Sequence, residues 1–202
     1  MKRFLLLAVA MFAMATANTL SAQGLLDALK GAATGLIDQA TGGKATELLL
    51  PGTWSYNAPA MRLKGSDALS EALANAAVTG LEEKLATAYN YVGIKPGTCS
   101  FKFDTDDRFT MTTSKRSYSG SYTYDAQTHR LELTFDTTLI KLGSMTGYAY
   151  IDGEALDLVF DCSKFFNFLT KIGAQLSSTS SLTKMLEKYD GMMIGFALQR
   201  SK

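Results

Sequence analysis

The sequence has few of the residues that carry catalysis or bind metals. It contains one histidine, His129, and two cysteines, Cys99 and Cys162, among 202 residues. This set has no metal-site spacing, and neither a serine nucleophile elbow nor a phosphate-binding loop is present. His129 follows a polar turn, which is typical of an exposed histidine rather than a catalytic one. We therefore expect no enzymatic activity, no catalytic residue, no metal site and no cofactor.

An excess of charge of one sign is also lacking. The chain has 20 basic and 19 acidic residues. Because residues 1–22 include Lys2 and Arg3, residues 23–202 have 18 basic against 19 acidic residues, a net charge of −1. Nucleic-acid binding would need a basic patch, so no nucleic-acid partner is expected. After residue 22 no apolar run is long enough to predict a membrane span.

The first 22 residues have the layout of a secretory signal peptide. A basic start, Met1-Lys2-Arg3, precedes an apolar run over 4–15 that is too short to cross a bilayer. Cleavage after Ala22 is the preferred prediction, and cleavage after Ala17 is the alternative. The protein is therefore expected to be secreted, to the periplasm or the cell exterior.

Two interpretations of the cysteines stay open. In an oxidising compartment Cys99 and Cys162 could form a disulfide that stabilises the fold by roughly 4 kcal/mol. Alternatively both are buried free thiols, since Cys99 shares a strand face with Phe101 and Phe103.

Residues 23–50 are predicted to be an N-terminal helical segment, and residues 51–202 one barrel domain. Thr41-Gly42-Gly43 interrupts the helical pattern, and a short turn over 44–50 leads to Pro51. The apolar stripe consists of Leu25, Leu26, Leu29, Ala33, Leu36, Ile37 and Ala40.

Two further helical regions are predicted within the domain. A helix follows the first strand (about 52–57) and is capped by Ser66-Asp67, and its one-sided stripe should cover the sheet. Another runs over 164–176 after a Ser163 cap, and a short helix over 182–189 precedes the last strand. The first stripe consists of Leu69, Leu73, Ala77, Leu81, Leu85, Ala88 and Val92.

From Cys99 onward the apolar period becomes two, which is typical of half-buried strands. Asp152-Gly153 between two such runs is a strong hairpin signal. With the first strand and a last strand over 191–200 we count eight, the number that closes into a small barrel. The sequence therefore predicts a mainly β fold with added helices, built on an eight-stranded antiparallel barrel.

The turn over 104–108 contains Asp104, Asp106 and Asp107. A calcium loop would need a downstream glycine and glutamate, which this turn lacks. We interpret it as a solvated hairpin turn.

Closing the barrel places the first strand beside the last. Arg200 can then stack on Trp54 within about 6 Å, the geometry of a cation–π contact. We interpret this pair as structural.

Gly52-Thr53-Trp54 resembles the glycine-any-tryptophan motif of lipocalins, with Arg200 in the place of their terminal-strand arginine. The mature chain is similar to an exported bacterial lipocalin-like (calycin-type) domain family of unknown function, whose marks include the Ser21-Ala22-Gln23 boundary and a helix after the first strand. True lipocalins have a loop there, so this helix is expected to act as a lid or plug.

The resemblance implies a protein that binds a small hydrophobic or amphipathic ligand in the barrel or at its mouth. The alternative is a non-enzymatic interaction or structural protein of the cell envelope with a filled barrel core, its partner unidentified. Gly120, Gly147 and Ala149 would leave room for a ligand if they point inward. The candidate ligand-binding residues are Phe101, Phe103, Phe109, Met111, Tyr122, Leu133, Phe135, Leu156 and Phe196.

Overall fold

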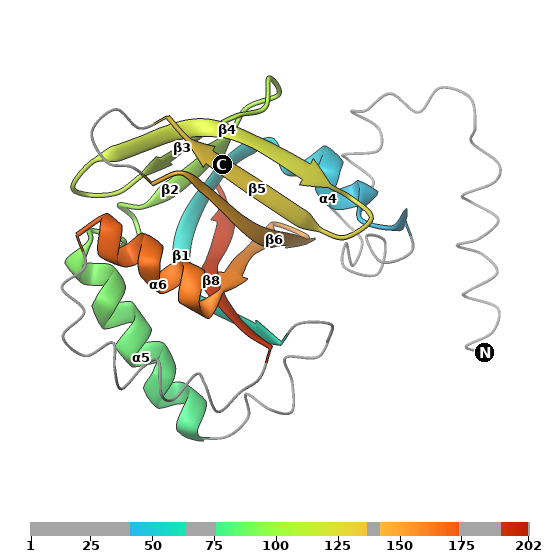
Figure 1. Ribbon diagram of the computed structural model, residues 1–202. Helices are drawn as coiled ribbons and strands as arrows, with labels where there is room; N and C mark the ends of the chain where they lie inside the picture. The colour runs from blue at the N-terminus through green and yellow to red at the C-terminus, as the bar shows by residue number, and fades with distance from the viewer. Residues whose placement is uncertain (1–40, 64–75, 137–141, 174–190, 202) are drawn as a thin grey trace, which may run out of the picture.

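The chain folds into a closed antiparallel barrel of eight strands, as the computed structural model shows for residues 41–63, 76–136, 142–173 and 191–201 (Figure 1). Each strand pairs with the next in the chain, and β8 pairs back with β1, so the predicted barrel is confirmed. The elements are α4 (Lys44–Leu49), β1 (Gly52–Leu63), α5 (Ala76–Tyr91), β2 (Ser100–Phe103), β3 (Arg108–Thr112), β4 (Ser117–Asp125), β5 (Arg130–Phe135), β6 (Ser144–Asp152), β7 (Ala155–Asp161), α6 (Cys162–Lys171) and β8 (Met192–Arg200).

The strands form where buried and exposed side chains alternate. In β4, Tyr118, Gly120 and Tyr122 are buried while Ser119 is exposed and Ser121 is partly so. β3, β5 and β6 show the same alternation. Because successive side chains point to opposite faces, every second residue enters the barrel interior.

The barrel has two different ends. At one end lie α4, the start of β1, the end of β8 and the hairpins that join β2 to β3, β4 to β5 and β6 to β7. The Thr46 hydroxyl of α4 accepts a hydrogen bond from the backbone N–H of Ile151 (3.2 Å) at this end. The chain passes through α5 and α6 at the opposite end, where Figure 1 shows the two helices together.

The helix after β1 covers the barrel, as its stripe predicted. Leu81, Leu85 and Val92 are 0–2 % exposed. Leu69 and Leu73, the first members of the stripe, lie outside the described residues. So do the predicted cap Ser66-Asp67, the segment 25–40 and the predicted helix over 182–189.

Helix α6 begins earlier than predicted. It starts at Cys162, and the Asp161 carboxylate caps it by accepting hydrogen bonds from the backbone N–H groups of Ser163 (3.0 Å) and Lys164 (3.2 Å). The prediction that Ser163 is the cap is wrong because β7 passes into α6 without a loop. Among the helices that the structure describes, none is long and apolar enough to cross a membrane.

Two segments differ from the predicted secondary structure around Pro51. Residues 44–50, predicted as a turn, contain helix α4, and Leu49 and Leu50 join the barrel core. The first strand, predicted to end near Asn57, continues to Leu63 through a register shift between Tyr56 and Ala58.

Candidate ligand-binding site

The nine candidate lining residues all point into the barrel. They come from β2, β3, β4, β5, β7 and β8, they belong to one hydrophobic cluster, and each is at most 6 % exposed. The sequence alternation therefore placed them correctly on the inner face. Whether they bind a ligand stays a prediction. They are Phe101, Phe103, Phe109, Met111, Tyr122, Leu133, Phe135, Leu156 and Phe196.

Aromatic rings in the interior contact one another. The ring centroids of Phe103 and Tyr122 are 5.1 Å apart, with planes at 81°. Phe109 meets Phe135 at 5.2 Å and 85°. Edge-to-face contacts at these distances are favourable beyond simple burial. A ligand inside the barrel would have to replace some of them.

Small residues on the inner face do not leave free space, contrary to expectation. A Cβ added at Gly120 would lie 2.7 Å from the Phe109 ring, and one at Gly147 would lie 2.4 Å from the Phe160 ring. Both distances are shorter than real Cβ contacts. Ala149 is fully buried within the same cluster. Large rings on neighbouring strands therefore occupy the volume that the two glycines release.

The inward tyrosine hydroxyl of Tyr122 is already engaged. It donates a hydrogen bond to the backbone carbonyl of Asp104 (2.9 Å) at the α4 end. Burial, with the nearby carboxylates of Asp107 and Asp104, raises the pKa of Tyr122 to about 12. The phenol therefore stays neutral at physiological pH and acts as a donor.

Trp54 and Arg200 close the α4 end of the barrel. Their residues pair across β1 and β8, and the Arg200 guanidinium carbon lies 4.2 Å from the centre of the Trp54 ring, so the predicted stacking is confirmed. The buried indole N–H donates to the Leu50 carbonyl (2.9 Å). Arg200 also donates to the carbonyls of Leu49 and Pro51, which ties α4 to the barrel.

Gly52 allows this stacking. Its φ is 142°, a value that residues other than glycine rarely adopt. A Cβ at this position would lie 2.5 Å from Nη1 of Arg200. The backbone therefore favours glycine at this position of the Gly52-Thr53-Trp54 motif, and a side chain there would also displace the Arg200 guanidinium.

The α5–α6 end contains a residue that sequence reasoning missed. Tyr89 of α5 is fully buried, and its ring lies 5.6–5.9 Å from the rings of Tyr56, Phe165 and Phe196. Its hydroxyl donates to the carbonyl of Gly195 (2.8 Å). The four-residue spacing from Leu81 through Leu85 to Tyr89 is the signal that could have found it.

The cysteines are free thiols rather than a disulfide. Cys99 is buried, and Cys162 is half-buried with its thiol donating to the carbonyl of Met192 (3.0 Å). Burial raises the pKa of each thiol to about 12. Both are therefore protonated and weakly nucleophilic at neutral pH.

The acidic turn between β2 and β3 is tied down by local contacts. The Asp104 carboxylate pairs with Lys102 (2.7 Å), and the Asp104 backbone N–H donates to the Arg108 carbonyl (2.8 Å). Across the described residues, no three His, Cys, Asp or Glu side chains are grouped to hold a metal ion.

His129 differs from the expectation of an exposed side chain. It is half-buried, with its ring 4.9 Å from Tyr150 and its Nδ1 3.1 Å from the Tyr124 hydroxyl. Packing against two tyrosines explains a histidine at this hairpin without catalysis.

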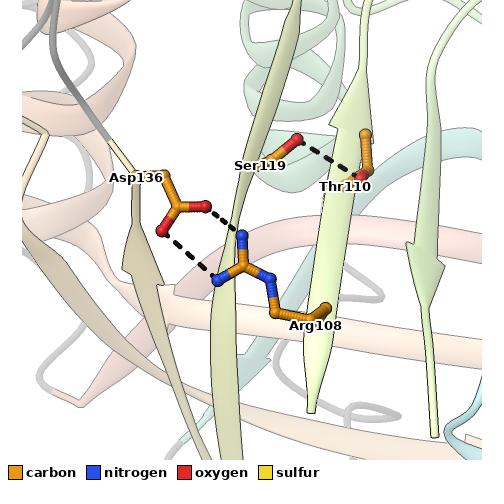
Figure 2. A network of polar contacts seen from close by, with 4 residues as sticks. All are labelled: Arg108, Thr110, Ser119 and Asp136. Carbon is orange, nitrogen blue, oxygen red and sulfur yellow. Dashed lines mark hydrogen bonds and ion pairs between the residues drawn. The ribbon is translucent and has the colours of Figure 1, made fainter. Parts of the chain in front are cut away.

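The outer face of β3–β5 is polar, in contrast to the interior. Figure 2 shows Arg108 donating to both carboxylate oxygens of Asp136, beside a hydroxyl pair formed by Thr110 and Ser119 (3.4 Å). Arg108 and Asp136 are both exposed, so solvent and salt screen their attraction. This face therefore offers hydroxyls and a paired charge, while the apolar side chains lie inside.

The family comparison agrees with the barrel fold. A family model described as a lipocalin-like domain (DUF4923) matches residues 26–200. No curated protein matches the chain significantly. A crystal structure of a DUF4847 family protein from Bacteroides vulgatus is similar at 15 % identity and a TM-score of 0.39, covering 77 % of this chain and 96 % of that chain. By the family match over most of its length, the chain belongs to the lipocalin-like domain family DUF4923.

Proposed function

We propose that the protein binds a small hydrophobic or amphipathic molecule inside the barrel. The observation that carries this proposal is the continuous apolar inner face, closed at one end by Trp54 and Arg200 and covered at the other by helices. Lipocalin-like barrels of eight strands have the size that admits one small ligand. Export past the cytoplasmic membrane, predicted from residues 1–22, fits a carrier that meets its ligand outside the cytoplasm.

The contacts inside the barrel define how binding would occur. Because the rings of Phe103, Phe109, Tyr122 and Phe135 touch one another, the ligand must separate them. The α4 end is fixed by the Arg200 contacts. We therefore propose that the ligand enters the barrel at the α5–α6 end.

A fluorescent fatty-acid or sterol analogue titrated into the purified protein tests the proposal. We expect saturable binding and displacement by unlabelled lipid. Leu133→Phe fills volume on the inner face that a ligand would need and should weaken binding about tenfold, which corresponds to about 1.4 kcal/mol. Thr134→Phe, on the outer face of the same strand, is the matched control and should leave the affinity unchanged.

The second candidate is an envelope interaction or structural protein with a filled barrel. The rings that occupy the space beside Gly120 and Gly147 favour it. In that case no analogue binds, and Leu133→Phe and Thr134→Phe behave alike in the titration.

A further inference from the structure

Tyr89 lies in its surroundings as a bound phenol would. Its ring is held by rings from three other elements: Tyr56 of β1 (5.9 Å), Phe165 of α6 (5.6 Å) and Phe196 of β8 (5.7 Å). Its hydroxyl donates to the Gly195 carbonyl of β8 at 2.8 Å. An aromatic enclosure with one directed acceptor is the usual composition of a small-molecule site.

Burial keeps this phenol in its neutral, donating form. The pKa of Tyr89 is raised well above the ordinary tyrosine value, first by burial and then by the neighbouring Tyr56 and Cys162. The Gly195 carbonyl can therefore accept a hydrogen bond from the Tyr89 hydroxyl at every physiological pH. Gly195 also pairs with Ala60 of β1 and Val159 of β7 in the sheet, so the Tyr89 hydroxyl adds a side-chain hydrogen bond to a carbonyl of the ladder. A ligand that replaced Tyr89 would lose this added bond unless it brought a donor of its own.

The helix that carries Tyr89 has features that suit displacement. Its second turn contains Gly80, which lowers helix propensity, and a Cβ added there would meet no atom within 4 Å. Between α5 and β2 lie Gly93 and Gly97, both in the left-handed region (φ 82° and 76°). Glycines at the ends of an element are suited to absorb the backbone rotation of a hinge.

We propose that α5 is a displaceable cover and that Tyr89 occupies the place of the ligand's head group. The barrel then takes flat apolar molecules that bear a ring hydroxyl, with this hydroxyl donating to the Gly195 carbonyl between Tyr56, Phe165 and Phe196. The inference rests on the proposed binding function and names its ligand class and the helix that must move.

The test compares 2-naphthol with 2-methoxynaphthalene, which has the same rings but no donor. We expect wild-type protein to bind 2-naphthol at least fivefold more tightly, about the effect of one net hydrogen bond. Hydrogen exchange of the α5 backbone amides should accelerate when 2-naphthol binds.

Variants of Tyr89 distinguish its role in covering the site from its role in stabilising the barrel. Tyr89→Phe keeps the ring but loses the bond to Gly195, so apparent affinity for 2-naphthol should rise about fivefold as the open state becomes more populated. Tyr89→Ala empties the site and should bind 2-naphthol still more tightly, provided that circular dichroism shows a folded barrel. Tyr124→Phe, a tyrosine at the other end of the barrel, is the matched control and should change nothing.

Each outcome decides the inference. Equal binding of the two naphthalenes, or α5 exchange that binding leaves unchanged, overturns it, and the proposed function survives if the lipid analogues still bind. If 2-naphthol binds more tightly than 2-methoxynaphthalene while the lipid analogues do not bind, the inference holds. The ligands are then flat aromatic molecules with a ring hydroxyl rather than lipids. If no apolar probe binds wild type and Tyr89→Phe fails to create binding, the inference and the proposed function both fall.

Discussion

Replacing Gly52 with alanine tests how the α4 end of the barrel is closed. At φ 142° the alanine would pay backbone strain of about 1–3 kcal/mol. Its Cβ would also lie 2.5 Å from Nη1 of Arg200 and displace the guanidinium from the Trp54 ring. The lost cation–π contact adds about 0.5–2 kcal/mol. We therefore expect the free energy of unfolding to fall by about 1.5–5 kcal/mol, the sum of these two costs.

Gly97→Ala is the matched control for this change. Gly97 also has a positive φ (76°), but a Cβ there would meet no atom within 4 Å. It should show the strain of about 1–3 kcal/mol without the arginine contribution. Urea unfolding followed by the fluorescence of Trp54, the single tryptophan, measures both variants.

A double variant isolates the part that belongs to the arginine. In an Arg200→Ala background, Gly52→Ala should cost only the strain, so the two changes are not additive. The reasoning is refuted if Gly52→Ala destabilises no more than Gly97→Ala, or if its cost is the same with and without Arg200.

Three further outcomes follow from the packing. Leu85→Ala should lower the free energy of unfolding by about 2–5 kcal/mol in chemical denaturation, because Leu85 is fully buried. Thr87→Ala, at an exposed position of the same helix, should change it by under about 0.5 kcal/mol. Similar losses in the two variants would contradict the covering role of α5. Asp161→Ala should cost about 0.5–2 kcal/mol through loss of the α6 cap, and an unchanged melting temperature would refute that cap. Cys99 and Cys162 should react slowly with a thiol reagent at pH 8 until the protein is unfolded. Because their pKa values of about 12 in the fold exceed the ordinary 9.0, the unfolded thiols ionise first, and stability should decline as pH rises from about 9 to about 12; rapid labelling of the native protein would contradict this.

The strands and the barrel could be predicted from the sequence because a period of two directly reports a half-buried strand. The stacking of Arg200 on Trp54 followed from closure, since a closed barrel must place its first strand beside its last. Both depend on local pattern and on topology, which the sequence contains.

The length of β1 could not be predicted from the alternation of apolar residues. Asn57 and Pro59 are poor strand formers, yet the strand continues to Leu63. β1 pairs with β2 only from Gly52 to Ser55, so beyond that point one side of the strand is not paired with β2. Proline is tolerated on such an edge because its missing N–H is not needed there.

The free volume inside the barrel could not be predicted from the spacing of residues in the sequence either. The sequence places Gly120 and Gly147 on the inner face but does not show that the rings of Phe109 and Phe160 lie against them. The four-residue spacing from Leu85 places Tyr89 on the apolar stripe of α5, but the sequence does not show that its hydroxyl donates to the Gly195 carbonyl.

Methyl NMR with a bound lipid analogue tests the central claim most directly. With labelled methionine and leucine methyl groups, we predict that the ligand shifts the signals of Met111, Leu133 and Leu156 inside the barrel and leaves that of the exposed Leu48 on α4 in place. Shifts confined to Leu48 and other surface methyl groups, or no shifts at saturating ligand, would contradict binding within the barrel.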